Sequence, residues 1–150
     1  MNEIRIKLIL MIVLFTSLVN AKDDKINELK EQIISAEGKD KLELLAKISV
    51  EYQLTSLILA EKYAKIGLKE SFKLFDTNYI NRFYGEIAMN KHHRSQFDSA
   101  TYYFRKSVEI AELSGNEYKA VLSKLNMAFL HIYNEEPQKA IEIYENSFPV

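Results

Sequence analysis

The chain lacks cysteine and tryptophan altogether, and its 150 residues include only four glycines and two prolines. Without cysteine, disulfide frameworks, thiolate metal sites and thiol nucleophiles are excluded. So few glycines and prolines favour long uninterrupted helices and argue against a loop-rich or all-β fold. A basic cluster is also missing, because the net charge is −1 and the lysines and arginines are scattered. This segment is therefore not expected to bind nucleic acid, which requires a basic stripe or patch.

Signs of catalysis or of a cofactor site are equally sparse. No glycine-rich phosphate loop is present, and the three histidines fit no Ser-His-Asp pattern. His92 and His93 with Glu86 are the nearest approach to a metal cluster, but adjacent histidines point about 100° apart on a helix. The sequence therefore predicts no enzyme activity, no metal and no cofactor. With 47% hydrophobic residues, it predicts one domain with an ample core.

The first 21 residues have the layout of a secretory signal peptide. Arg5 and Lys7 precede an uncharged apolar stretch at 8–19, and small residues follow at 19–21. An apolar stretch of this length suits an export signal and is too short for a spanning helix. We expect cleavage after Ala21 and export to the periplasm or the medium. The alternative is an uncleaved N-terminal anchor or a core helix. A lipoprotein anchor is excluded because no cysteine follows.

A forty-residue repeat organises the remaining sequence. Ala60, Ala100 and Ala140 each begin the same pattern. Four residues later stand Ala64, Phe104 and Tyr144, and three residues after these stand Gly67, Ser107 and Ser147. These spacings place small and bulky residues on one helical face. A fixed period in this range predicts a stacked repeat array.

Hydrophobic periodicity predicts a leading helix within 22–38 and then three helix pairs, at about 40–75, 78–115 and 116–148. Gly38 is expected to end the leading helix. Capping boxes are expected at 40–43 and 95–98, because an acceptor residue is followed three positions later by an acidic one. Ser56 and Asn116 are expected to cap helices, and Pro137 suits a first turn.

Within each pair, the first helix carries a large-small dipeptide at its packing face. Ile87-Ala88 and Met127-Ala128 are the examples in the second and third pairs. With the alanine-headed pattern, these features resemble the tetratricopeptide repeat family in its longer form. The resemblance implies an all-α, antiparallel helix-pair solenoid of about three repeats. The packing residues that it implies are Ala60, Ala64, Gly67, Ile87, Ala88, Ala100, Phe104, Ser107, Met127, Ala128, Ala140 and Tyr144. Lys91 and His131 depart from it, because an aromatic residue is usual there.

The family resemblance also implies a binding surface, because the first helix of each pair lines a concave groove that receives a protein or peptide. By register, the partner-binding residues are Arg82, Glu86, Met89, Asn126, Phe129 and Tyr133. Asn126 would hold a ligand's backbone amide, Arg82 a carboxylate, and Phe129 with Tyr133 an apolar side chain. The alternative is that the third-pair residues pack against a further repeat or a capping helix. The lysine and asparagine pattern with which the family clamps C-terminal carboxylates is absent in this register.

The wider layout of signal peptide, leading helix and repeats resembles the exported N-terminal half of certain bacterial signalling proteins. In those proteins a histidine kinase or a helix-turn-helix regulator follows the repeats. Two functions are therefore open: a non-enzymatic exported protein-binding module, or the sensor segment of a membrane signalling protein that lacks its effector part. Membrane contact is expected only through such a missing C-terminal part. The uncapped last repeat leaves self-association open.

Overall fold

The computed structural model describes residues 2–147, without the side chains of residues 2–3 and 15–21. Every regular element in this range is an α-helix, so the expected all-α class is confirmed there. The helices are α1 (Asn2–Ser35), α2 (Gly38–Tyr52), α3 (Leu57–Lys73), α4 (Thr77–His93), α5 (Phe97–Leu113), α6 (Glu117–Tyr133) and α7 (Pro137–Ser147). None of the described helices is long and apolar enough to cross a membrane.

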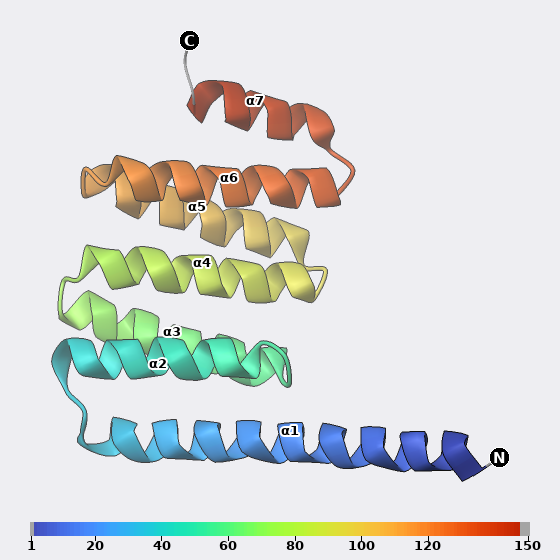
Figure 1. Ribbon diagram of the computed structural model, residues 1–150. Coiled ribbons are helices and arrows are strands. Elements are labelled where there is room, and N and C mark those ends of the chain that lie inside the picture. The colour runs from blue at the N-terminus through green and yellow to red at the C-terminus, as the bar shows by residue number, and fades with distance from the viewer. Residues whose placement is uncertain (1, 148–150) are drawn as a thin grey trace.

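The helices form one stack, in which each helix packs on the next in the sequence (Figure 1). Two further contacts join helices that are not consecutive: α2 touches α4, and α4 touches α6. No such contact joins α3 to α5 or α5 to α7 within the described residues. The helices α2, α4 and α6 therefore approach one another more closely than α3, α5 and α7 do. We call the surface that α2, α4 and α6 form the first-helix face.

Helix α1 is longer than the leading helix that the sequence predicts. The sequence predicts a helix within 22–38, whereas α1 begins at Asn2 and runs through the expected cleavage point. Between Ile4 and Leu14 its large apolar side chains are exposed, and only Ile26 and Leu29 are buried in the core. Cleavage after residue 21 stays a prediction.

Two expected caps, Ser56 and Asn116, are confirmed, and Asp76 caps a third helix without having been predicted. The side chains of Ser56, Asp76 and Asn116 accept hydrogen bonds from backbone N–H groups in the first turns of α3, α4 and α6. These bonds satisfy donors that a helix N-terminus otherwise leaves unpaired. Pro137 begins α7, as expected from its fixed φ angle.

Both expected capping boxes are wrong. The N-cap of α2 is Glu37, so Gly38 begins this helix and Asp40 lies inside its first turn. Ser95 takes a positive φ of 56° because it belongs to the end of α4, where Gln96 N–H donates to the carbonyl of Lys91. This turn needs a left-handed residue after the helix, so Ser95 is not available as a cap.

The same helix ending recurs every twenty residues. After α3, α4, α5 and α6, the residue in the left-handed conformation is Phe75, Ser95, Gly115 and Glu135 respectively. In each case the next N–H donates to a carbonyl five residues earlier, as at the end of α4. One turn geometry therefore separates successive helices from α3 to α7, and it fixes a common register along the stack.

Most of the expected packing residues are buried between helices. Buried residues are Ala60, Ala64, Gly67, Ile87, Ala88, Ala100, Phe104, Ser107, Ala128 and Ala140, and Met127 is half-buried. Tyr144 differs, because it is 57% exposed whereas Phe104, forty residues earlier, is 1% exposed. Leu130 of α6 covers Phe104, but no described helix covers the corresponding face of α7. The expected end of this pair, Phe148, lies outside the described residues.

Candidate functional site

A pocket of about 300 Å³ opens on the first-helix face between α4 and α6. It brings together four of the six residues that the sequence predicts for partner binding. These four are Met89, Asn126, Phe129 and Tyr133. Three further residues complete the lining: His92, Phe104 and Leu130. Leu130 was not foreseen, although its place one helical turn after Asn126 was a usable signal.

The pocket has an apolar floor and an aromatic rim. Phe104 and Leu130 are buried beneath it, whereas Phe129 and Tyr133 are exposed at its edge. The His92 ring meets the Tyr133 ring nearly at right angles, with 5.0 Å between their centroids. Such a cavity suits an apolar side chain of a ligand. The exposed amide of Asn126 adds both a donor and an acceptor, which could bond a peptide backbone.

His92 contributes a polar atom to this apolar lining. Its Nδ1 is buried and has no hydrogen-bond partner within the described residues. Burial, together with the neighbouring His93, lowers the pKa of His92 below its usual value. The imidazole is therefore neutral at neutral pH, and a neutral ring keeps one nitrogen as an acceptor.

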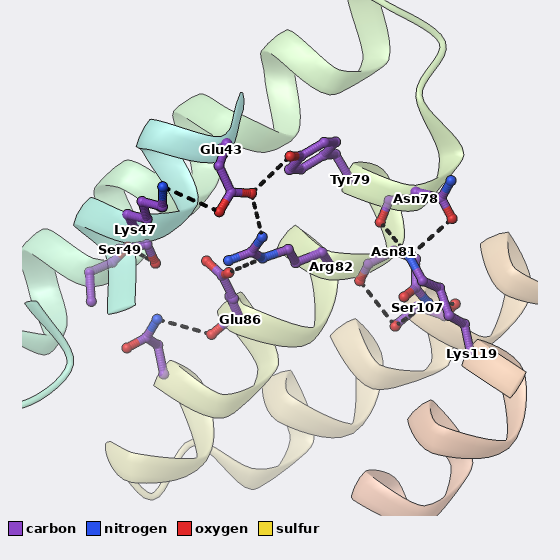
Figure 2. Close-up of polar contacts among 12 residues, drawn as sticks. Glu43, Lys47, Ser49, Asn78, Tyr79, Asn81, Arg82, Glu86, Ser107 and Lys119 are labelled. Carbon is purple, nitrogen blue, oxygen red and sulfur yellow. Dashed lines mark hydrogen bonds and ion pairs between the residues drawn. The ribbon is translucent and has the colours of Figure 1, made fainter. Parts of the chain in front are cut away.

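Arg82 and Glu86 lie on α4 outside this pocket. Arg82 donates from Nη1 to Glu43 Oε2 at 3.0 Å and from Nε to Glu86 Oε1 at 3.1 Å. The Tyr79 hydroxyl also donates to Glu43, at 2.9 Å, and this bond lowers the pKa of Glu43 (Figure 2). Two carboxylates of the chain thus already flank the Arg82 guanidinium. The positive charge of Arg82 is therefore largely compensated within the chain, which weakens its attraction for a ligand carboxylate.

Glu86 is the carboxylate of this cluster that its surroundings stabilise least. Its Oε2 is buried and accepts no hydrogen bond within the described residues. Burial raises the pKa of Glu86, although Arg82 favours its ionised form. An ionised carboxylate here is therefore penalised by the fold, which suits a structural role rather than ligand capture.

We expect Glu86→Gln to stabilise the protein at neutral pH and to have little effect in acid. A raised folded-state pKa favours folding while the carboxyl is protonated in both states, and this gain is lost as pH rises from the unfolded pKa to the folded one. The glutamine amide of the variant never ionises and avoids the loss. Urea unfolding of both proteins between pH 4 and pH 8 measures this difference. A destabilisation of the same size at every pH would contradict the assignment.

A buried polar junction fixes the three helices around the pocket. Asn81 Nδ2 of α4 donates to the Ser107 carbonyl at 2.8 Å and to the Ser123 hydroxyl at 3.2 Å (Figure 2 shows Asn81 and Ser107). These bonds join α4 to α5 and to α6. Buried polar groups that are satisfied in this way set the register of packed helices. The junction therefore holds the pocket walls at a defined separation.

A second cavity, of about 500 Å³, lies on the opposite side among α5, α6 and α7. His131 and Glu136 meet there, with 2.8 Å between Nδ1 and Oε2. Hydrogen bonds from Lys139 and then from His131 lower the pKa of Glu136 to about 2. These charged groups are thus paired with one another. The first-helix pocket is therefore the better candidate for ligand binding.

No protein-family model matches this chain, and no curated protein matches it. The family resemblance therefore rests on the residue pattern alone. Among the described residues, no three histidine, aspartate or glutamate side chains gather as they would around a metal ion.

Proposed function

We propose that the chain is an exported, non-enzymatic repeat protein of the tetratricopeptide type that binds a protein or peptide through its first-helix face. The observation that carries this proposal is the pocket between α4 and α6, which has a buried apolar floor and exposed aromatic residues at its rim. Exposed aromatic residues around a small apolar cavity are typical of binding hot spots. In this proposal the first-helix face is the concave side of a helix-pair solenoid.

The contacts between helices support the solenoid. Because α2, α4 and α6 touch whereas α3, α5 and α7 do not, the stack is closer together on the first-helix side. A stack that is tighter on one side curves toward it, and curved repeat arrays bind extended partners along the inner surface. The forty-residue alanine register and the recurring helix ending are the local features that repeat such a geometry.

The proposed ligand is an extended segment that places one apolar side chain between Phe129 and Tyr133. Asn126 would bond the segment's backbone beside the pocket. Export is proposed from the N-terminal layout. Mass spectrometry of the protein recovered outside the cytoplasm tests it, because a chain that begins at Lys22 is expected and an intact N-terminus contradicts cleavage.

The second candidate is the sensor segment of a membrane signalling protein. The large apolar residues exposed on α7 favour it: Ile141 is 52% exposed and Tyr144 57% exposed, whereas Phe104 at the equivalent position of α5 is buried against Leu130. Coding sequence for a spanning helix and an effector domain after codon 150 would support this candidate, and a stop codon there would exclude it.

Peptide selection tests the binding site directly. A displayed random peptide library is selected in parallel on the full chain and on Phe129→Asp, and the affinities of the selected peptides are then measured. Removing an exposed aromatic anchor and adding a charge is expected to weaken binding at least about tenfold. Tyr102→Asp is the matched control, because Tyr102 is an exposed aromatic residue on α5, away from this pocket. Peptides that bind Phe129→Asp as tightly as the natural chain would contradict the proposal.

A further inference from the structure

The outer side of α3 carries a continuous row of lysines and exposed isoleucines. We call this row the lysine stripe; its residues are Ile58, Lys62, Lys65, Ile66, Lys69 and Lys73. At 100° and 1.5 Å per residue, they fall within an arc of about 100° and along about 22 Å of the helix. Most of them line one open groove with Arg94. The lysines that look scattered in the sequence are thus gathered by the helix.

Carboxylates neutralise this stripe only in part. Glu61 is the acidic residue of the groove, and it is only 6% exposed. Its two oxygens already bind Lys65 at 2.7 Å, Lys91 at 2.9 Å and Arg94 at 2.9 Å. Lys73 pairs with Glu70 at 2.7 Å, whereas Lys62 and Lys69 have no ion-pair partner within the part of the chain that the structure describes. The groove therefore keeps a positive surplus exposed to solvent.

The fold itself does not require positive charge at these positions. Forty residues later, on α5, the positions of Ile58 and Lys69 are occupied by Asp98 and Glu109. On α7, the position of Lys62 is occupied by Glu142. The same helix face is thus mixed on α5 and acidic on α7. Because the packing environment recurs, packing does not account for Lys62 and Lys69, which form no ion pair within the described residues.

Phe75 gives an independent indication at the end of the same helix. It is 88% exposed and adopts a φ of 52°, a conformation that is costly for a bulky residue. The equivalent turn after α5 has Gly115, with a φ of 68°. The recurring turn explains this φ, but it does not explain why a bulky apolar side chain stands there almost fully exposed. Phe72 and Leu74 are also exposed beside it.

We propose that the lysine stripe and Phe75 dock the protein on an anionic lipid surface. A lysine ammonium is a hydrated point charge and lacks the planar guanidinium group with which arginine binds one carboxylate through two hydrogen bonds. A row of lysines therefore suits many mobile phosphates. Isoleucines between the lysines and a phenylalanine at the end can enter the headgroup region, as amphipathic membrane-surface helices do. Because α3 lies behind α2 in Figure 1, the first-helix pocket stays accessible when α3 is docked.

Vesicle co-sedimentation of the full chain tests this surface. At about 0.1 M salt, vesicles with about 30% phosphatidylglycerol in phosphatidylcholine are expected to bind the protein at least about tenfold more tightly than pure phosphatidylcholine. Reversing the two unpaired lysines, in Lys62→Glu with Lys69→Glu, is expected to remove that difference. The exposed apolar part of α1 is present in every variant, so its own affinity for lipid cancels.

Two further variants separate this proposal from general charge effects and from misfolding. Arg105→Glu changes a cation at the position of Lys65 on α5, and it should bind anionic vesicles like the natural chain. Phe75→Gly relieves the backbone strain, so it should unfold at an equal or higher urea concentration while binding vesicles several-fold more weakly.

Several results would overturn the proposal. These are equal binding to anionic and neutral vesicles, full binding by the double lysine variant, and an equal loss in Arg105→Glu. Binding to soluble polyglutamate without binding to anionic vesicles would also overturn it, because the stripe would then belong to an acidic protein partner.

Discussion

Phe83→Ala is expected to lower the free energy of unfolding by about 3–5 kcal/mol, which is the usual cost of emptying a buried phenylalanine site. Phe83 is fully buried in the core cluster that joins α2, α3 and α4. Its ring lies directly against Gly67 of α3, because a Cβ built on that glycine would come within 2.1 Å of the ring's Cζ. Urea unfolding followed by circular dichroism measures the loss.

The contact between Phe83 and Gly67 allows a stricter test by double-mutant cycle. Gly67→Ala alone is expected to cost about 1–3 kcal/mol, because overpacking forces the two helices apart. In the Phe83→Ala background the added methyl group enters the empty site. The combined loss should therefore be clearly smaller than the sum of the two single losses. A strictly additive result would show that Gly67 and Phe83 do not pack as described.

Glu61→Ala is expected to lower the free energy of unfolding by about 2–4 kcal/mol at neutral pH. Removing one partner of a buried ionic cluster leaves opposite charges uncompensated. Here the cations left behind are Lys65, Lys91 and Arg94, of which Lys91 is the least exposed. Glu112→Ala is the control, because Glu112 is exposed and, among the described residues, forms an ion pair only with Lys124. Its loss should stay below about 0.5 kcal/mol.

The contribution of Glu61 should also depend on pH. Burial alone would raise its pKa, but hydrogen bonds from Lys65 and Lys91 outweigh burial and lower the pKa below 4.5. A lowered folded-state pKa gives stability that is present above the unfolded pKa and is lost as pH falls through the folded one. The natural chain and Glu61→Ala should therefore approach each other in stability in acid. A constant difference down to pH 2 would contradict this assignment.

The sequence predicts the helices well because their determinants are local. Ser56 and Asn116 act as caps through bonds within three residues, and the alanine register places small residues wherever helices meet closely. The capping box at 95–98 is wrong because the turn before α5 is set by the end of α4, which gives Ser95 a left-handed conformation. A window of four residues does not contain that information.

The ion-pair arrangement could not be read from the sequence, because its partners are distant along the chain. Glu61 binds Arg94 from 33 residues away. That cluster also accounts for Lys91, where the family pattern has an aromatic residue, because Lys91 reaches a buried carboxylate instead. The amino-acid composition does not reveal the lysine stripe, for a related reason. Its charge is concentrated by helical geometry, and Lys62 and Lys69 form no ion pair within the described residues.

The candidate binding surface was predicted in part. The register correctly places Met89 near Phe129 and Tyr133, because residues forty apart occupy equivalent places on neighbouring helices. The register cannot show that Arg82 forms an ion pair with Glu43, which comes from a different helix pair. The pocket depth depends on Leu130 and Phe104, whose burial follows from the packing of α5 against α6.

Methionine methyl NMR tests the central claim most directly. The chain has four methionines, of which Met89 lines the first-helix pocket and Met127 lines the cavity on the opposite side. When a selected peptide is added to the full chain, the Met89 methyl signal should shift in proportion to saturation while the Met127 signal stays in place. A shift of Met127 with an unchanged Met89 would contradict binding at the first-helix face.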